Sequence, residues 1–116
     1  MTQSDKELLL KDLCARLPYG VKVEVPSGIR ELTAIDICSE YVNHAWPFLN
    51  YKPYLRPMSS MTEEELDTMW NIWEQNSASE AASKITDFLN GRFLDHHQLI
   101  EKGLALEAPE GMYKIK

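Results

Sequence analysis

The densest group of metal-ligand residue types in the chain is the tripeptide Asp95-His96-His97. Imidazole nitrogens and carboxylate oxygens are ligands for zinc, and histidine is also the commonest general base. Asp95 is expected to cap a short helical turn that contains both histidines. Because successive helical side chains point about 100° apart, the three side chains then diverge, and a metal needs a distant ligand such as His44 or Glu101. Neither lies at a recognised ligand spacing, so we predict no metal and no cofactor.

The other reactive side chains do not predict nucleophilic catalysis. Cys14 is expected on the buried apolar face of an N-terminal helix, where burial keeps a thiol inert. Cys38 lies far from it in sequence, and the pair fits neither a metal knuckle nor a redox motif, so both are interpreted as small buried hydrophobes. Ser59 and Ser60 precede a helix, but the glutamates at 63–65 already occupy its positive end. We therefore predict that the protein is not an enzyme.

A short segment that is rich in aromatic residues and proline is the strongest candidate for a function. Interfaces favour rigid aromatic side chains together with arginine. Two prolines restrict the segment, so its side chains lose little further entropy on binding. The competing interpretation is that the aromatic residues belong to the core. The predicted partner surface consists of Tyr51, Lys52, Tyr54, Leu55 and Arg56.

Two alternatives to a protein-interaction function remain open. The first is a small-ligand binder or an enzyme, with a pocket lined by Tyr41, His44, Trp46 and His96; convergent polar groups and a shifted histidine pKa would distinguish it. The second is an acidic inhibitor that occupies a basic site on a nucleic-acid enzyme.

The charge distribution argues against direct binding to DNA or RNA. The chain has 12 Lys and Arg against 18 Asp and Glu, and its net charge of −6 lies entirely after residue 60. Nucleic-acid binding needs the reverse, a clustered basic surface that replaces counterions. The expected partner is therefore a protein of unknown identity, and the sequence leaves the oligomeric state open.

The first half of the chain predicts a helix followed by a hairpin. A capping box formed by Ser4 and Glu7 indicates a helix from Asp5 to Leu17. Residues 21–25 alternate between apolar and polar, as in a half-buried strand, and after a turn the residues 29–37 favour a second strand.

Two extended pieces are expected next. One lies around residues 41–48. Prolines at 53 and 57 are typical of neither a helix interior nor a central strand, so we expect residues 52–57 to cross the surface in an extended form.

The second half predicts two amphipathic helices and a terminal hairpin. Thr62 and Glu65 form a capping box at the start of one helix. A third helix follows, capped by Ser77 or Ser79, with Gly91 expected in a left-handed C-cap. Residues 104–113 indicate a strand, a turn and a strand. One apolar stripe on the first of these helices predicts that its tryptophans are buried in the core; the stripe consists of Leu66, Met69, Trp70 and Trp73.

These elements predict a single α+β domain over residues 1–116. A small antiparallel sheet, made of the hairpin plus terminal strands, is expected to pack against three to four helices. The longest apolar runs fall far short of the about 20 residues that cross a membrane, so no membrane association is expected. The first residues lack the basic and apolar regions of a secretory signal, which favours the cytoplasm.

Three stretches of the sequence resemble a group of short, uncharacterised proteins of gut anaerobic bacteria and of their phages and integrated elements. The stretches are KDLCARLPYGVK at 11–22, KPYLRPMSSMTEEE at 52–65, and residues 99–113. No activity is known for that group, so the resemblance assigns no residue a role. It implies a small cytoplasmic accessory protein of phage or mobile-element origin, without a cofactor.

Overall fold

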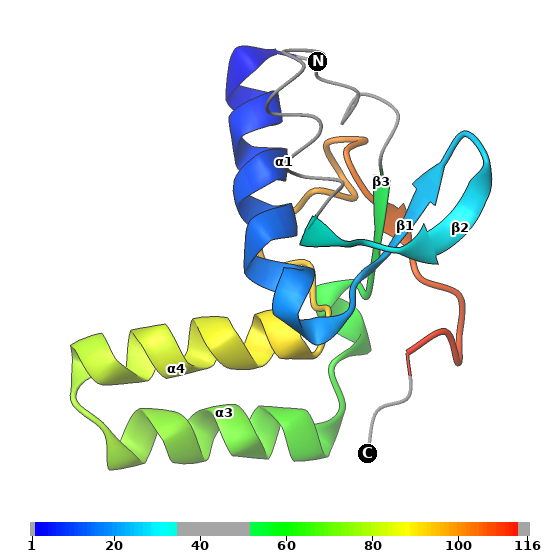
Figure 1. Cartoon of the computed structure of the whole chain (residues 1–116). Helices are drawn as coiled ribbons and strands as arrows, with labels where there is room; N and C mark the ends of the chain where they lie inside the picture. The colour runs from blue at the N-terminus through cyan, green and yellow to red at the C-terminus, as the bar shows by residue number, and fades with distance from the viewer. Residues whose placement is uncertain (1, 35–51, 114–116) are drawn as a thin grey trace.

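The computed structural model describes residues 2–34 and 52–113. Its elements form a mixed four-stranded sheet with helices, which confirms the α+β class (Figure 1). Cys38, the extended piece expected at 41–48, and Tyr51 lie outside the described residues. The elements are α1 (Gln3–Arg16), β1 (Lys22–Val25), β2 (Gly28–Glu31), β3 (Lys52–Leu55), α3 (Glu63–Gln75), α4 (Ala78–Gly91) and β4 (Leu106–Glu107), with 3-10 turns at Leu17–Tyr19 and Met58–Ser60.

The strand order in the sheet is β2-β1-β3-β4. β1 and β2 form the predicted antiparallel hairpin, with Val25 opposite Gly28. β3 is antiparallel to β1, but β4 is parallel to β3, so the predicted terminal hairpin is wrong. The chain runs alongside β3 instead of folding back, and the backbone N–H of Ala108 donates to the carbonyl of Leu55 at 2.8 Å.

The prediction that the proline segment is not a central strand is also wrong, because β3 lies between β1 and β4. Its two neighbours are staggered along its length. β1 pairs with Lys52 and Pro53, whereas β4 pairs with Tyr54 and Leu55. Pro53 therefore meets only one ladder, and the missing N–H of a proline is tolerated there.

The start of α1 lies two residues before the predicted one. Thr2 is the N-cap and forms the capping box with Asp5, because this pair has the same spacing as Ser4 and Glu7. Leu9 and Leu13 of this helix are fully buried. Cys14 is exposed, so its predicted burial is wrong.

The hydrophobic core lies between α1, the sheet and the segment that follows α4. None of the described residues of α3 or α4 belongs to this cluster. Its members come from α1, from β1 and β3, from the residue before β1 and the residue after β2, and from residues between 93 and 105. They are Leu9, Leu13, Val21, Val23, Val25, Leu32, Leu55, Phe93, Leu99, Leu104 and Ala105.

Tyr113 links the two central strands although it is not in a strand. Its hydroxyl accepts from the backbone N–H of Lys22 at 2.9 Å and donates to the carbonyl of Tyr54 at 2.7 Å. Its ring stacks on Phe93, with 3.9 Å between centroids. Burial raises the pKa of Tyr113 to about 12, so the hydroxyl keeps its hydrogen at neutral pH.

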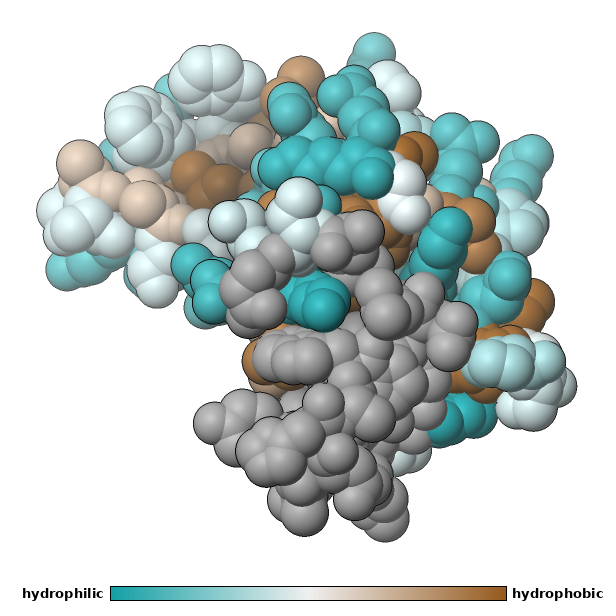
Figure 2. Space-filling model, turned by 90° about the horizontal axis from the view of Figure 1, so that it is seen from above, coloured by the Kyte–Doolittle hydropathy of each residue, from teal (hydrophilic) through white to brown (hydrophobic). Residues whose placement is uncertain are grey.

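The helices α3 and α4 form an antiparallel pair that projects from the rest of the molecule (Figures 1 and 2). Thr62 caps α3 through the predicted capping box with Glu65, and Ser77 caps α4. We call α3 and α4 together the helical arm. Because the arm lies apart from the core, the core does not cover the apolar side chains of α3.

Candidate functional site

The helical arm carries an apolar surface that faces solvent. Leu66 is 47 % exposed, Trp70 57 % and Trp73 50 %. Together with Met69 and with Ile85 of α4, they line a groove of about 360 Å³. We call these five residues the arm face.

The predicted burial of Trp70 and Trp73 is therefore wrong, although the predicted helix and its stripe are correct. The spacing of Leu66, Met69, Trp70 and Trp73 places them on one side of α3. That side points away from the core, because α3 instead directs the buried Glu65 inward. Periodicity identifies which residues share a face but not what covers it.

A row of acidic side chains borders the arm face on α3. Glu63, Asp67 and Glu74 fall within about 40° of one another around the helix, beside the apolar stripe. All three are exposed, and none of them forms an ion pair with another residue of the described ranges. We call these three residues the acidic ridge. Residues 61–91 contain seven acidic residues and one basic residue, Lys84.

The predicted partner surface is largely interior. Tyr54 is 8 % exposed and Leu55 is fully buried, so the prediction is wrong for these two side chains. The hydroxyl of Tyr54 donates to Glu24 at 2.9 Å, which joins β3 to β1. Lys52 is half-buried in the same strand. The competing interpretation, that the aromatic residues belong to the core, is correct for Tyr54.

Arg56 is also committed to internal contacts. Its guanidinium bonds both carboxylate oxygens of Glu65, each at 2.8 Å, and donates to the carbonyl of Ser60 at 2.9 Å. These bonds lower the pKa of Glu65 to about 2. Pro57 follows Arg56 after the end of β3, and the side chain of Arg56 extends to Glu65 in the first turn of α3.

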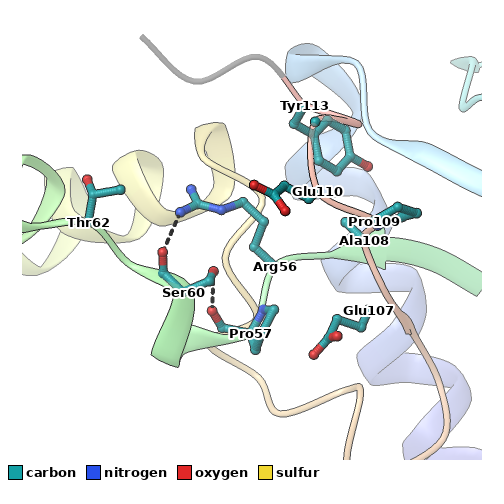
Figure 3. A pocket seen from close by; sticks show the side chains of 10 residues that line it. Arg56, Pro57, Ser60, Thr62, Glu107, Ala108, Pro109, Glu110 and Tyr113 are labelled. Carbon is teal, nitrogen blue, oxygen red and sulfur yellow. Dashed lines mark hydrogen bonds between the residues drawn. The ribbon is translucent and has the colours of Figure 1, made fainter.

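Arg56 also lies in a cavity of about 520 Å³ between the start of the arm and residues 107–113 (Figure 3). In that view its guanidinium points to the carbonyl of Ser60. Glu107 and Glu110 line the cavity and are exposed. Because Glu65 neutralises Arg56, the cavity offers an anion no free cation among the described side chains that line it, and we assign it no ligand.

A second cluster lies where α1 meets the segment after α4. Asp12 and Arg16 are fully buried and form an ion pair, with Nε donating to Oδ1 at 2.7 Å. Arg16 also donates to the carbonyl of Leu94 at 2.7 Å. The imidazole of His97 reaches the same carboxylate, with Nδ1 2.8 Å from Oδ2.

The predicted divergence of the two histidines is wrong. Residues 95–103 form turns rather than a helix, and Gln98 has a left-handed backbone with φ of 59°. The rings of His96 and His97 lie 4.2 Å apart. Burial, and then the nearby His97 and Arg16, lower the pKa of His96 to about 4.

Asp95 accepts hydrogen bonds from the backbone, as a helix cap does. The residues that it bonds lie in turns and not in a helix. Its carboxylate accepts from the N–H groups of Leu99 and Ile100, at 2.8 and 2.9 Å. Gly91 is the last helical residue of α4, and the left-handed residue that was predicted there is Phe93. The alternative pocket cannot be assembled from described residues, since Tyr41, His44 and Trp46 lie outside them.

Comparison with known protein families, with curated proteins and with solved structures finds no match for this chain. The resemblance to proteins of gut anaerobes and phages therefore stays a prediction. Within residues 2–34 and 52–113, no helix has the length and apolar character needed to cross a bilayer.

Proposed function

We propose that the protein is a non-enzymatic interaction module whose arm face binds a basic amphipathic helix of a partner protein. The observation that supports this most directly is the exposure of Trp70 and Trp73 on a helix pair outside the core. Tryptophan is the residue type most enriched among those that dominate binding energy. A contiguous apolar surface of this kind is characteristic of an interaction site.

The shape of the arm face suits a helix. Two antiparallel helices present a groove between their side-chain ridges, and a third helix fills it by the packing used in helical bundles. Helix-in-groove recognition relies on apolar anchors three and four residues apart. Leu66, Met69, Trp70 and Trp73 provide that spacing, and Ile85 closes the far side of the groove.

The charge of the arm selects the partner. The acidic ridge runs along one border of the groove, so a bound helix places its own flank beside Glu63, Asp67 and Glu74. Lysine or arginine on that flank is attracted, whereas acidic residues are repelled. A second copy of this chain brings another acidic arm, and the like charges oppose a dimer through this face.

The test uses a designed peptide of about 20 residues with leucines along one helical face and lysines beside them. Fluorescence anisotropy of the labelled peptide measures its binding to the whole protein. The proposal predicts binding that weakens about tenfold or more in Trp70→Ser and in Trp73→Ser. Tyr19→Ser is the matched control, because Tyr19 is an exposed aromatic residue away from the arm face, and it should leave the affinity unchanged.

Two further peptides separate the apolar and the charged contributions. One has the same composition with its leucines distributed around the helix, and the other has glutamates in place of the lysines. The affinity of each for the protein should be lower than that of the first peptide by about tenfold or more. Equal binding of all three peptides, or binding insensitive to both tryptophans, would contradict the proposal. A monomer–dimer equilibrium that Trp70→Ser abolishes would instead assign the face to a second copy.

A further inference from the structure

The structure brings Asp12 together with two adjacent histidines that follow it by more than 80 residues in the sequence. Asp12 comes from α1, and His96 and His97 come from the turns after α4. One ligand atom of each side chain lies within 4.8 Å of those of the other two. We propose that Asp12, His96 and His97 bind a single divalent transition-metal ion of the zinc type.

The residue types suit such an ion. Two imidazole nitrogens with one carboxylate oxygen form the protein part of many zinc sites that keep an open position. Carboxylate and imidazole ligands together also accept cobalt and nickel, whereas magnesium and calcium prefer oxygen alone. The separation of Asp12 from the histidines by more than 80 residues hides this set from any search for local spacing.

The backbone geometry explains why adjacent histidines lie close together. In a helix, neighbouring side chains diverge by about 100°. Here the carboxylate of Asp95 accepts from the N–H groups of Leu99 and Ile100. Gln98, which has a left-handed backbone, turns the chain between Asp95 and Leu99. The two rings therefore lie 4.2 Å apart at the end of α1.

Outer partners already hold two of the three ligands. Arg16 donates to Asp12 through Nε and Nη2, at 2.7 and 3.2 Å, and so fixes the orientation of the carboxylate. Asn90 is buried, and its Oδ1 lies 2.8 Å from Nε2 of His96. An amide oxygen only accepts, so the hydrogen of that ring is on Nε2, and Nδ1 keeps its lone pair. Such outer contacts orient metal ligands.

The same Arg16 sets a limit on affinity. Its positive charge opposes a cation at Asp12, so the site should bind more weakly than one whose carboxylate has only neutral partners. Oδ2 of Asp12 now faces Nδ1 of His97 at 2.8 Å. Because a carboxylate oxygen only accepts, Nδ1 carries the hydrogen of this bond. On binding, that hydrogen leaves Nδ1 and the ring keeps one on Nε2 instead, so that Oδ2 of Asp12 and Nδ1 of His97 each bond the metal.

The test titrates the whole protein with Co²⁺, followed by its visible absorption, and then displaces Co²⁺ with Zn²⁺. We expect one equivalent to give the intense bands of a four- or five-coordinate ion. His96→Gln and His97→Gln should each weaken binding by about tenfold or more. Glu101→Gln, in the same segment but outside the cluster, should bind as the unaltered protein does.

Two other variants distinguish the site from weak binding by an exposed histidine pair. Asn90→Ala removes the support of His96 and should weaken binding about tenfold. Asp12→Asn should also weaken metal binding about tenfold, and circular dichroism shows whether this variant is folded. If it is unfolded, the result for Asn90→Ala alone tests the proposal. Weak, octahedral bands, or affinities unchanged in Asn90→Ala, would overturn the proposal.

Discussion

The guanidinium of Arg56 holds the carboxylate of Glu65 through two parallel hydrogen bonds of 2.8 Å. Arg56 follows β3, and Glu65 lies in the first turn of α3, where it also accepts from the backbone N–H of Thr62 at 2.9 Å. The same guanidinium donates to the carbonyl of Arg92 at 3.3 Å, just past α4. This arginine therefore joins both ends of the helical arm to the sheet and fixes the direction of the arm.

Replacing Arg56 with alanine should lower the free energy of unfolding by about 2 to 3 kcal/mol. The change leaves Glu65, which is 3 % exposed, without its charged partner. Urea denaturation measures the loss. Lys102→Ala, which removes an exposed cation, serves as the control and should change stability by less than about 0.5 kcal/mol.

The same pair should make stability depend on acid. The pKa of Glu65 is lowered from 4.5 to about 2 in the folded protein, so its contribution is complete above about pH 4.5. As the pH falls from 4.5 towards 2, the unfolded chain binds a proton first and the contribution is lost. The loss is at most about 3 kcal/mol. Denaturation of Glu65→Gln over this range should show a smaller slope; an equal slope would contradict the assignment.

Trp70→Ala should destabilise the protein by less than about 1 kcal/mol, because more than half of the side chain is exposed. Leu13→Ala is the comparison, since Leu13 is fully buried in the core and its truncation should cost about 2 to 5 kcal/mol. Chemical denaturation of both variants checks the order. A loss of about 3 kcal/mol in Trp70→Ala would place this tryptophan in a covered position.

The affinity for the basic peptide should depend on salt through the acidic ridge. Asp67→Asn removes one charge beside the arm face, so binding should weaken and its dependence on salt concentration should become shallower. Glu7→Gln removes an equal charge from the exposed side of α1, whose start lies away from the helical arm (Figure 1), and should change neither. Titrations at several salt concentrations measure both slopes. Equal effects of the two variants would show that net charge alone attracts the peptide.

Tyr113→Phe should lower stability by about 1 to 3 kcal/mol, because a bond from the Lys22 N–H and a bond to the Tyr54 carbonyl are both lost. The ring and its stacking on Phe93 remain, so the variant isolates the hydroxyl. Thermal unfolding measures the effect, and Tyr19→Phe, at an exposed position, should have none. If Tyr113→Phe leaves the stability unchanged, water takes over the hydrogen bonds of the hydroxyl.

Local signals in the sequence were sufficient for several elements. The capping box of Thr62 and Glu65 and the apolar stripe that follows predict α3 correctly, because both depend on residues a few positions apart. The alternating residues of β1 and the turn before Gly28 likewise predict the first hairpin. The misplaced start of α1 reflects a second capping box two residues earlier.

The candidate sites depend on contacts between distant residues, which local signals do not contain. Pro53 argues against a central strand, yet the staggered neighbours of β3 accommodate it. Arg56 has the composition of a binding residue but is occupied by Glu65. His96 and His97 approach each other because the segment turns where a helix was expected, and the distant ligand is Asp12.

Acrylamide quenching of tryptophan fluorescence measures how accessible Trp70 and Trp73 are in the free protein and in its complex with the basic peptide. Trp46→Phe removes the third tryptophan, so that Trp70 and Trp73 alone report. The arm face should be freely quenched in the protein by itself and protected when the basic helical peptide is saturating. Tryptophans that are already shielded in the free protein, or that stay equally accessible with the peptide bound, would contradict the assignment of this face as the binding surface.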